Sequence, residues 1–179
     1  ECGVFNGAGL FTWAQLVNIF EPSNYTRKII GFDTFQGFPT VDEKDSNEIS
    51  KPCVGDLVGS TKKEMYAGIE KINLERHLSH ISNMEIIEGD FLKTGEEYLS
   101  KNKHMLISLL YLDFDLYEPT KKALEIFLPL MPKGAIICFD ELNCATYPGE
   151  TAAFLEMLNV NKCNLRRFSI DPWISYVTL

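Results

Sequence analysis

Residues 105–115, MLISLLYLDFD, give the clearest sequence indication of the fold. Residues 105–112 form a nearly continuous apolar run, which is typical of a strand buried on both faces of a parallel sheet. A helix is expected over 120–130, with Pro119 at its first turn, and the apolar segment 134–139 then ends in Asp140 and Glu141. A strand, a helix and a second buried strand in this order predict two parallel strands joined by a crossover helix.

The rest of the chain repeats this alternation of short apolar strands and helices with apolar residues at helical spacing. We expect further strands at 1–4, 28–33, 84–91, 165–170 and 174–179, and further helices at 10–20, 61–78, 96–101 and 151–158. The pattern predicts an α/β fold, with a doubly wound and mostly parallel sheet covered by helices on both faces. The two strands after residue 164 predict a terminal hairpin that adds one antiparallel strand.

We expect one domain over residues 1–179, because no internal repeat or linker interrupts the alternation. Residues 40–60 are polar and without period, and a loop of that length inside a compact domain is usually functional or mobile. We interpret it as a lid-like insertion over a site, with a disordered surface insertion as the alternative. The chain begins at Glu1 without an initiator methionine, so we expect the N-terminus to be truncated and any preceding substrate-binding cap to be absent.

The composition excludes several classes of protein. The chain has 179 residues, a formal charge of −8, and 45% hydrophobic residues, as an ordinary globular domain does. No apolar run reaches the roughly 20 residues that cross a bilayer, and no signal peptide is visible, so we expect a cytoplasmic protein without a membrane partner. The acidic balance argues against a nucleic-acid partner, since phosphate binding needs clustered lysine and arginine. Five cysteines without a CxxC pair favour free thiols over disulfides or zinc.

Acidic residues follow almost every expected strand, where the ligands of open parallel sheets bind. The glycine turn Gly3-x-x-x-Gly7-x-Gly9 lacks the G-x-G-x-x-G spacing of dinucleotide sites, but it allows a ligand close to the backbone. Asp33 lies where an acidic side chain can accept bonds from both ribose hydroxyls of a nucleoside, and Asp90 ends the next strand. We favour a nucleoside site over the alternative of a tight turn with solvated acids.

A second set of acids follows the strands at 105–112 and 134–139, namely Asp113, Asp115, Asp140 and Glu141. Four negative charges in one crevice are costly unless protons or a cation neutralise them. Oxygen ligands in this number suit Mg²⁺ or Ca²⁺, so we favour a metal site. Asp113 and Asp115 share a face only if the strand continues past Phe114. In the alternative, Asp115 caps the following helix and Glu141 is solvated.

Four segments resemble known methyltransferases. Residues 1–9, ECGVFNGAG, resemble the first motif of class I S-adenosylmethionine-dependent methyltransferases. Residues 31–39, GFDTFQGFP, are similar to the D-[ST]-F-x-G-[LF]-P segment of the macrocin O-methyltransferase family. Residues 112–120, LDFDLYEPT, and 134–141, GAIICFDE, resemble that family's LD-x-D-L-Y-x-[SP]-T and G-G-x-I-x-x-D-[DE] segments. The resemblance spans nearly the whole chain in order.

This resemblance implies a Rossmann-like sheet of seven strands with the last one antiparallel. It also implies methyl transfer from S-adenosylmethionine to a hydroxyl of a small molecule, often a sugar of a natural product, with Mg²⁺ or another divalent cation. Members of the family frequently form oligomers, so a homo-oligomer is expected.

The resemblance also assigns roles to individual residues. The methionine part of the cofactor is expected against Glu1, Gly3 and Gly7, the ribose against Asp33 and Thr34, and the adenine against Asp90 and Phe91. Asp113 is expected beside the cofactor and, with Asp140 and Glu141, around the metal. Asp115 is expected behind the metal or in place of one ligand. Leu116 stands where related catechol enzymes carry a lysine base, so the catalytic candidates are Asp113 and Asp115, with a base outside this sequence as the alternative.

Two other functions are compatible with the fold class. A nicotinamide-dependent oxidoreductase predicts a G-x-G-x-x-G turn after the first strand, which this chain lacks. A non-catalytic nucleoside-binding domain predicts loss of the acidic metal cluster, which is intact here. The sequence therefore favours a metal-dependent O-methyltransferase.

Overall fold

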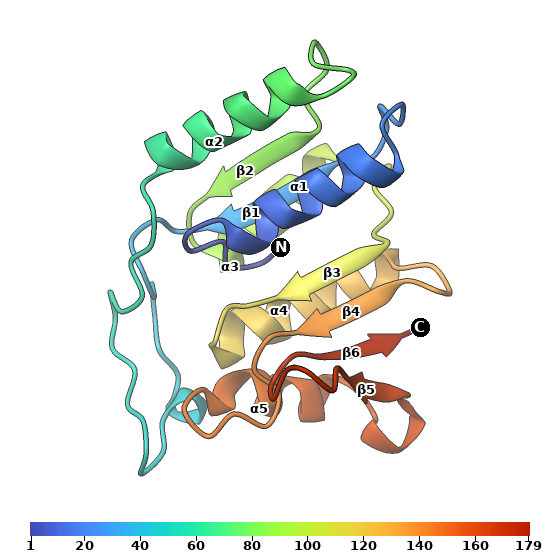
Figure 1. Cartoon of the computed structure of the whole chain (residues 1–179). Coiled ribbons are helices and arrows are strands. Elements are labelled where there is room, and N and C mark those ends of the chain that lie inside the picture. Colours follow the sequence, from blue (N-terminus) through green and yellow to red (C-terminus); the bar gives the residue numbers. More distant parts are fainter.

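One mixed sheet forms the centre of the computed structural model, which describes residues 1–179 (Figure 1). Its strands are β1 (Ile29–Asp33), β2 (Met84–Glu88), β3 (Leu109–Leu112), β4 (Ile136–Phe139), β5 (Leu165–Arg167) and β6 (Ser175–Thr178). Cys2 forms parallel bridges with both Phe32 and Leu112, so residues near the N-terminus occupy a strand position between β1 and β3. The order is therefore β2, β1, Cys2, β3, β4, β6, β5, which confirms the expected Rossmann-like sheet of seven strand positions.

The direction of the last strand follows the expectation from the sequence. Strand β6 pairs antiparallel with both β4 and β5, whereas β1 with β2 and β3 with β4 are parallel. The terminal hairpin does not simply extend the sheet, because β6 lies between its partner β5 and strand β4.

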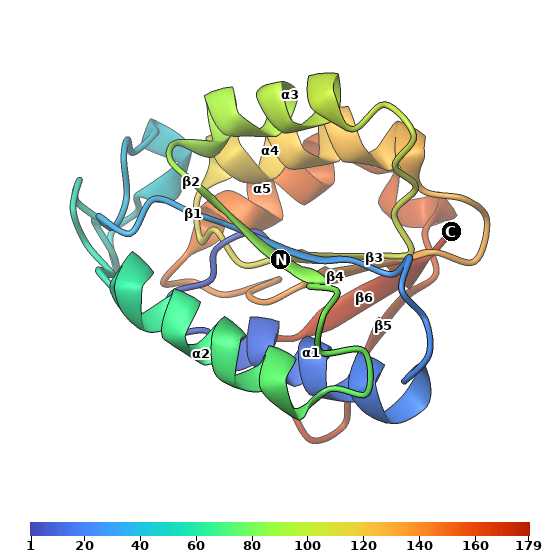
Figure 2. The same ribbon diagram turned by 90° about the horizontal axis from the view of Figure 1, so that it is seen from above.

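Helices cover both faces of the sheet (Figure 2). Helices α1 (Ala8–Phe20) and α2 (Lys62–Glu75) lie on one face, and α3 (Phe91–Lys101), α4 (Tyr117–Phe127) and α5 (Pro148–Met157) lie on the other. Each face buries its own apolar cluster: Leu112, Ile137 and Phe139 pack in one, and Val4, Leu10 and Met65 in the second. No helix of the protein combines the length and apolar character needed to cross a bilayer.

Most expected elements differ from the structure by a few residues at their ends; the helix expected at 120–130 is α4 at Tyr117–Phe127, and the strand expected at 84–91 ends at Glu88. Two further differences have a clear cause. The helix expected at 96–101 begins at Phe91, because the Asp90 side chain accepts the Leu92 N–H and caps it there. The strand expected at 105–112 is shorter, because Ile107 donates its N–H to the Leu130 carbonyl instead of to a neighbouring strand.

The segment 40–60 contains no strand and only the short 3-10 helix η1 (Glu43–Asp45). Asp45 is 2% exposed, and its carboxylate accepts the N–H groups of Asp42 (2.7 Å) and Tyr117 (2.6 Å). A side chain on Gly149 would place its Cβ only 2.0 Å from Asp45 Oδ1, so the start of α5 leaves room for this carboxylate. The segment is thus anchored against α4 and α5 at one buried point. Its role as a lid stays a prediction.

Candidate active site

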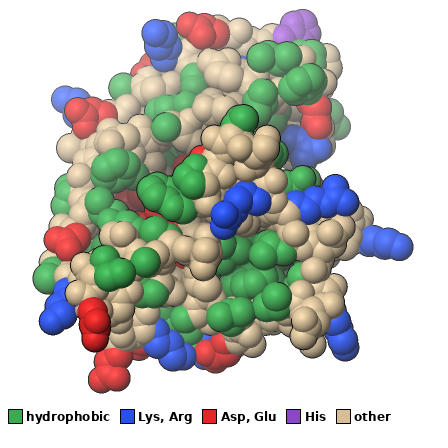
Figure 3. Space-filling view, turned by 60° about the horizontal axis from the view of Figure 1, so that its bottom comes forward, with side chains coloured by type: hydrophobic (Ala, Val, Ile, Leu, Met, Phe, Trp, Pro, Cys, Tyr) green, Lys and Arg blue, Asp and Glu red, His purple; other side chains and the backbone are tan.

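A cavity of about 380 Å³ lies at the carboxyl ends of the parallel strands. Figure 3 shows acidic side chains in a hollow bordered by hydrophobic ones. Most of the expected site residues line this cavity, namely Gly3, Asp33, Thr34, Asp90, Phe91, Asp113, Asp115, Asp140 and Glu141. Glu1 and Gly7 are not among its lining residues.

Glycines at the start of the chain let the backbone pass close to β3. Gly3 has φ +89°, and a Cβ there would lie 1.8 Å from the Asp113 carbonyl oxygen, so only glycine fits. Gly7, with φ +80°, precedes α1 as its N-cap. The Glu1 carboxylate is buried beside Gly9, and burial raises its pKa to about 7.

The Asp33 side chain organises the turn that follows β1. Oδ2 accepts the N–H groups of Val4 (2.7 Å) and Phe5 (2.8 Å), and Oδ1 accepts that of Phe35 (2.7 Å). A carboxylate offers about four acceptor positions, so Asp33 retains capacity for about one further donor. The Thr34 hydroxyl is likewise engaged, because it donates to the Gly37 carbonyl. Ribose binding by Asp33 and Thr34 stays a prediction, and it fits one ribose hydroxyl on Asp33 better than two.

Asp90 and Phe91 stand where β2 gives way to α3. Asp90 Oδ1 accepts the Leu92 N–H at 3.0 Å, so the side chain has a structural role besides the expected contact with adenine. Phe91 is 3% exposed and packs against Phe114, with ring centroids 4.9 Å apart. Both rings line the cavity, which gives its expected adenine side an apolar wall.

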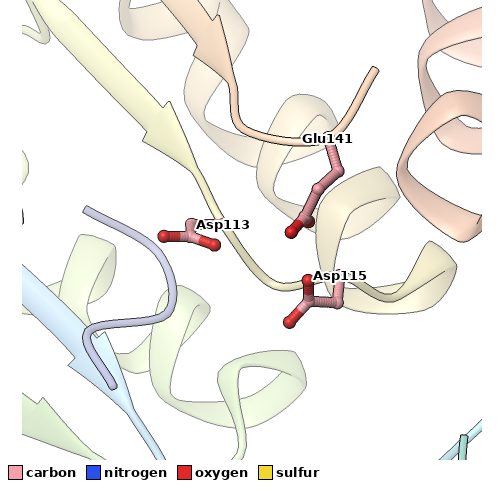
Figure 4. A group of neighbouring side chains, drawn as sticks. All are labelled: Asp113, Asp115 and Glu141. Atoms are coloured by element: carbon pink, nitrogen blue, oxygen red, sulfur yellow. The ribbon is translucent and has the colours of Figure 1, made fainter. Parts of the chain in front are cut away.

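The opposite side of the cavity gathers carboxylates. Asp113, Asp115 and Glu141 each offer an oxygen within 4.8 Å of the others, and we call these three residues the acidic group (Figure 4). The strand ends at Leu112, so continued strand geometry does not bring the two aspartates together. Asp115 has φ +63°, a left-handed conformation that aspartate tolerates, and this turn directs its carboxylate toward Glu141.

Asp140 lies outside this group of three and has a partner of its own. The Tyr111 hydroxyl donates a hydrogen bond to Asp140 Oδ1. The structure thus places Asp115, rather than Asp140, together with Asp113 and Glu141. Metal binding by Asp113, Asp140 and Glu141 stays a prediction, and the geometry favours Asp115 as the third member.

The alternative roles considered for Asp115 and Glu141 are not observed. Helix α4 has no cap from Asp115, because its first N–H is bound by Asp45 of the segment 40–60. Glu141 is not fully solvated, since its Oε2 is buried without a partner.

Burial and mutual repulsion keep protons on the acidic group. Burial, with the charges of Asp140 and Glu141, raises the pKa of Asp113 to about 8. Burial raises the pKa of Asp115 to about 7, and burial beside Asp115 raises the pKa of Glu141 to about 10. Without a cation the group therefore shares protons at neutral pH.

Three residues near the site were not singled out from the sequence. Glu150 of α5 is fully buried and accepts the Glu141 N–H at 2.9 Å. Tyr111 holds Asp140, and Tyr147 lines the cavity just before α5. A tyrosine in an apolar strand and a glutamate in a short helix carry no periodic signal, although Tyr147 before Pro148 does mark a helix start.

Comparison with known proteins identifies the family of this chain. A family model described as a methyltransferase domain matches residues 1–142. The crystal structure of CalS11, a calicheamicin methyltransferase, is 35% identical with a TM-score of 0.92, over 99% of this chain and 70% of that chain. The apo structure of CalS11, a TDP-rhamnose 3'-O-methyltransferase of calicheamicin biosynthesis, is 32% identical with a TM-score of 0.83 over the same shares.

A more distant structure shares the fold alone. The O-methyltransferase NovP is 19% identical with a TM-score of 0.71, over 99% of this chain and 69% of that chain. A search of curated protein sequences found no match.

The fold and the match over 1–142 define a methyltransferase of class I architecture, and the chain belongs to the methyltransferase-domain family. The enzyme is an S-adenosylmethionine-dependent O-methyltransferase. The oxidoreductase and the non-catalytic domain are therefore set aside.

Proposed function

We propose that this enzyme methylates a hydroxyl of a sugar or natural product in a reaction that depends on Mg²⁺ or a similar divalent cation, as macrocin O-methyltransferases do. The observation that carries the proposal is the acidic group, whose three carboxylates converge within 4.8 Å beside the cavity. The similarity to CalS11, which acts on TDP-rhamnose, supports a sugar hydroxyl as the acceptor.

The residues present fit a hard divalent cation. Mg²⁺ binds oxygen ligands, and the acidic group offers only carboxylates. Glu141 Oε2 is buried and lacks a hydrogen-bond partner, which is costly for a carboxylate unless a cation or a proton meets it. Asp113 and Glu141 would hold the ion, and Asp140 would complete the set when Asp115 serves as the base.

The chain's own residues then divide the work of methyl transfer. S-adenosylmethionine supplies an electrophilic sulfonium methyl group, and Mg²⁺ supplies the positive charge that stabilises a deprotonated acceptor oxygen. The S–CH₃ bond breaks as the O–CH₃ bond forms, and the acceptor proton passes to the Asp115 carboxylate. Burial raises the pKa of Asp115 to about 7 in the metal-free protein, and a cation beside it would lower that pKa, so Asp115 would be ionised and able to accept a proton at neutral pH.

The cofactor occupies the other side of the cavity in this proposal. Gly3 allows the methionine part to approach the backbone, and Asp33 accepts one ribose hydroxyl. Phe91, Phe114 and the Asp90 turn form the adenine wall. This arrangement directs the sulfonium toward Asp113, which lies between the two sides.

The acceptor would lie against residues contributed by the segment 40–60 and its neighbours. Phe38, Leu57 and Tyr147 line the main cavity and also a second cavity of about 290 Å³ beside it. Lys51 lines the second cavity and is the only lysine or arginine lining either one. We place the reacting sugar near the acidic group and the remainder of the acceptor, with any anionic part, toward Lys51.

A direct assay tests the proposed function. Purified protein is incubated with radiolabelled S-adenosylmethionine and a panel of nucleoside-diphosphate sugars, free sugars and catechols, with Mg²⁺ or with EDTA. We expect transfer to a sugar hydroxyl that EDTA abolishes and added Mg²⁺ restores. Transfer that is insensitive to EDTA would exclude the metal, and transfer only to catechols would exclude the sugar. A cytoplasmic location and a homo-oligomer remain part of the proposal, the latter measurable by analytical ultracentrifugation.

A further inference from the structure

Glu150 is an unusual residue for the interior of a small domain. Its side chain is 0% exposed, on the first turn of α5, and it comes from a helix that lies behind the acidic group. Oε1 accepts the Glu141 N–H at 2.9 Å, while Oε2 is buried without any partner. No cationic side chain pairs with this carboxyl, and burial beside Glu141, Asp113 and Asp140 raises its pKa well above the usual value.

Burying such a side chain lowers the stability of the fold, so its presence points to a specific role for its hydrogen bond. A buried carboxyl with one unmade hydrogen bond costs free energy, and an apolar side chain of similar volume avoids that cost. The bond that Glu150 does make is local and specific, because it binds the backbone of a residue in the acidic group. This is the only hydrogen bond of the Glu141 N–H, which would be unpaired if the bond were lost.

The start of α5 also supports the other turn of the site. Gly149, the residue before Glu150, makes room for the Asp45 carboxylate, which binds the Tyr117 N–H just after Asp115. Thr151, the residue after Glu150, accepts the Asn143 N–H at 2.8 Å. Three consecutive residues of one helix thus adjoin both chain turns that carry the acidic group.

We propose that Glu150 is a positioning residue, whose bond to the Glu141 N–H fixes the direction in which the Glu141 carboxylate enters the acidic group. The expected consequence, weaker metal binding when the bond is lost, rests on the proposed metal-dependent function. The structural part of the inference concerns the Glu141 backbone alone. Glu150 is not a catalytic residue, because it does not line the cavity.

The test compares variants that keep or remove the acceptor atom. Glu150→Gln retains an oxygen that can accept the Glu141 N–H, Glu150→Met removes it, and Glu150→Asp keeps the acid but shortens its reach. Glu125→Met on α4 is the matched control, because Glu125 is exposed and does not line the cavity. The readouts are hydrogen exchange of the Glu141 amide by NMR, Mn²⁺ binding by electron paramagnetic resonance, and S-adenosylhomocysteine binding by calorimetry.

We expect Glu150→Met and Glu150→Asp to speed exchange of the Glu141 amide and to weaken Mn²⁺ binding by about tenfold or more, as loss of a residue that orients a metal ligand does. Glu150→Gln and the control should match wild type, and S-adenosylhomocysteine binding should not change in any variant. If Glu150→Met does not fold, Glu150→Asp carries the same expectation.

Two results would overturn the inference: unchanged amide exchange and Mn²⁺ binding in the Met and Asp variants, or a Gln variant as impaired as Met. Wild-type protein that binds no Mn²⁺ would refute the proposed metal function separately, because the amide readout still decides whether Glu150 holds the turn. In that case normal exchange in Glu150→Met would overturn the positioning role as well.

Discussion

The two sides of the one cavity treat their carboxylates in opposite ways. At the nucleoside side, Asp33 accepts three backbone N–H groups and Asp90 caps a helix, so both side chains are bonded within the protein itself. At the acidic side, Asp113, Asp115 and Glu141 face one another, with raised pKa values and a buried oxygen that lacks a partner.

Under the proposed function, this difference determines which ligand each side accepts. A carboxylate surrounded by backbone donors keeps its charge and geometry without a ligand. Its remaining lone pair can then accept a hydrogen bond from a neutral hydroxyl. Carboxylates that face each other are stable only with protons or a cation between them. The nucleoside side is therefore complete before the cofactor binds, whereas the acidic side needs either protons or a cation.

The largest effect should come from removing a carboxylate of the acidic side. We expect Asp115→Asn to lower kcat by about 10²- to 10⁴-fold, because the acceptor proton loses its base. S-adenosylhomocysteine affinity, measured by calorimetry, should stay at the wild-type value, since Asp115 belongs to the other side of the cavity. A large loss of cofactor affinity with little change in kcat would show that Asp115 contributes to cofactor binding and that the two sides do not act separately.

The complementary change is Asp33→Ala at the nucleoside side. A hydrogen bond to a charged group contributes about 1.5–3 kcal/mol, so S-adenosylhomocysteine affinity should fall by about tenfold or more. The variant should also melt at a lower temperature, because Val4, Phe5 and Phe35 lose the acceptor of their N–H groups. Mn²⁺ binding should be unaffected, and calorimetry with each ligand separately measures this. Equal losses of Mn²⁺ and cofactor binding would mean that Asp33 supports the whole cavity.

The same contrast explains how much could be predicted from the sequence. The nucleoside side was placed because Asp33 and Asp90 follow strands whose apolar patterns are strong, and the mostly parallel sheet follows from the α/β alternation. The pairing of Asp115 with Asp113 depends on a left-handed residue, which no periodic pattern reveals. Likewise α3 begins at Phe91 because Asp90 caps it, whereas Gly95 within the segment conceals the helix.

The supporting acids escaped prediction for a related reason. Asp45 lies in a polar segment that gives no register, and Glu150 looks like any glutamate in a helical first turn. Their functions depend on which backbone N–H groups tertiary structure brings to them, Tyr117 for Asp45 and Glu141 for Glu150. Sequence patterns predict which face of an element is buried, but they do not predict such single contacts between distant segments.

A third prediction concerns the stability of the metal-free protein. The acidic group has folded-state pKa values of about 7 to 10, above the usual 3.8 for aspartate and 4.5 for glutamate. The folded state therefore holds more protons than the unfolded state between these limits, and stability falls as pH rises through that window. In EDTA, Tm should fall from pH 6 to pH 9 by at least about 2–4 °C, which corresponds to about 1 kcal/mol.

The control for this prediction is the added cation. Mg²⁺ should reduce the pH dependence of Tm, because a bound cation replaces the protons of the acidic group. The Asp33→Ala variant should retain the slope, since Asp33 lies at the other side. A Tm that rises with pH in EDTA would contradict the picture of carboxylates held together by protons.

The smallest effect is expected for substitutions of Asp90, at the nucleoside side. Asp90 accepts the Leu92 N–H as the N-cap of α3, and asparagine caps helices about as well as aspartate, whereas alanine at this position costs about 1 kcal/mol. Asp90→Asn should therefore leave Tm almost unchanged, and Asp90→Ala should lower it. If S-adenosylhomocysteine affinity follows the same order, Asp90 acts by holding the turn beside the adenine wall. If both variants lose affinity equally while only Asp90→Ala loses stability, the charge of Asp90 itself contacts the cofactor. The role of Asp90 would then be ligand binding, as at the acidic side, rather than support of the turn.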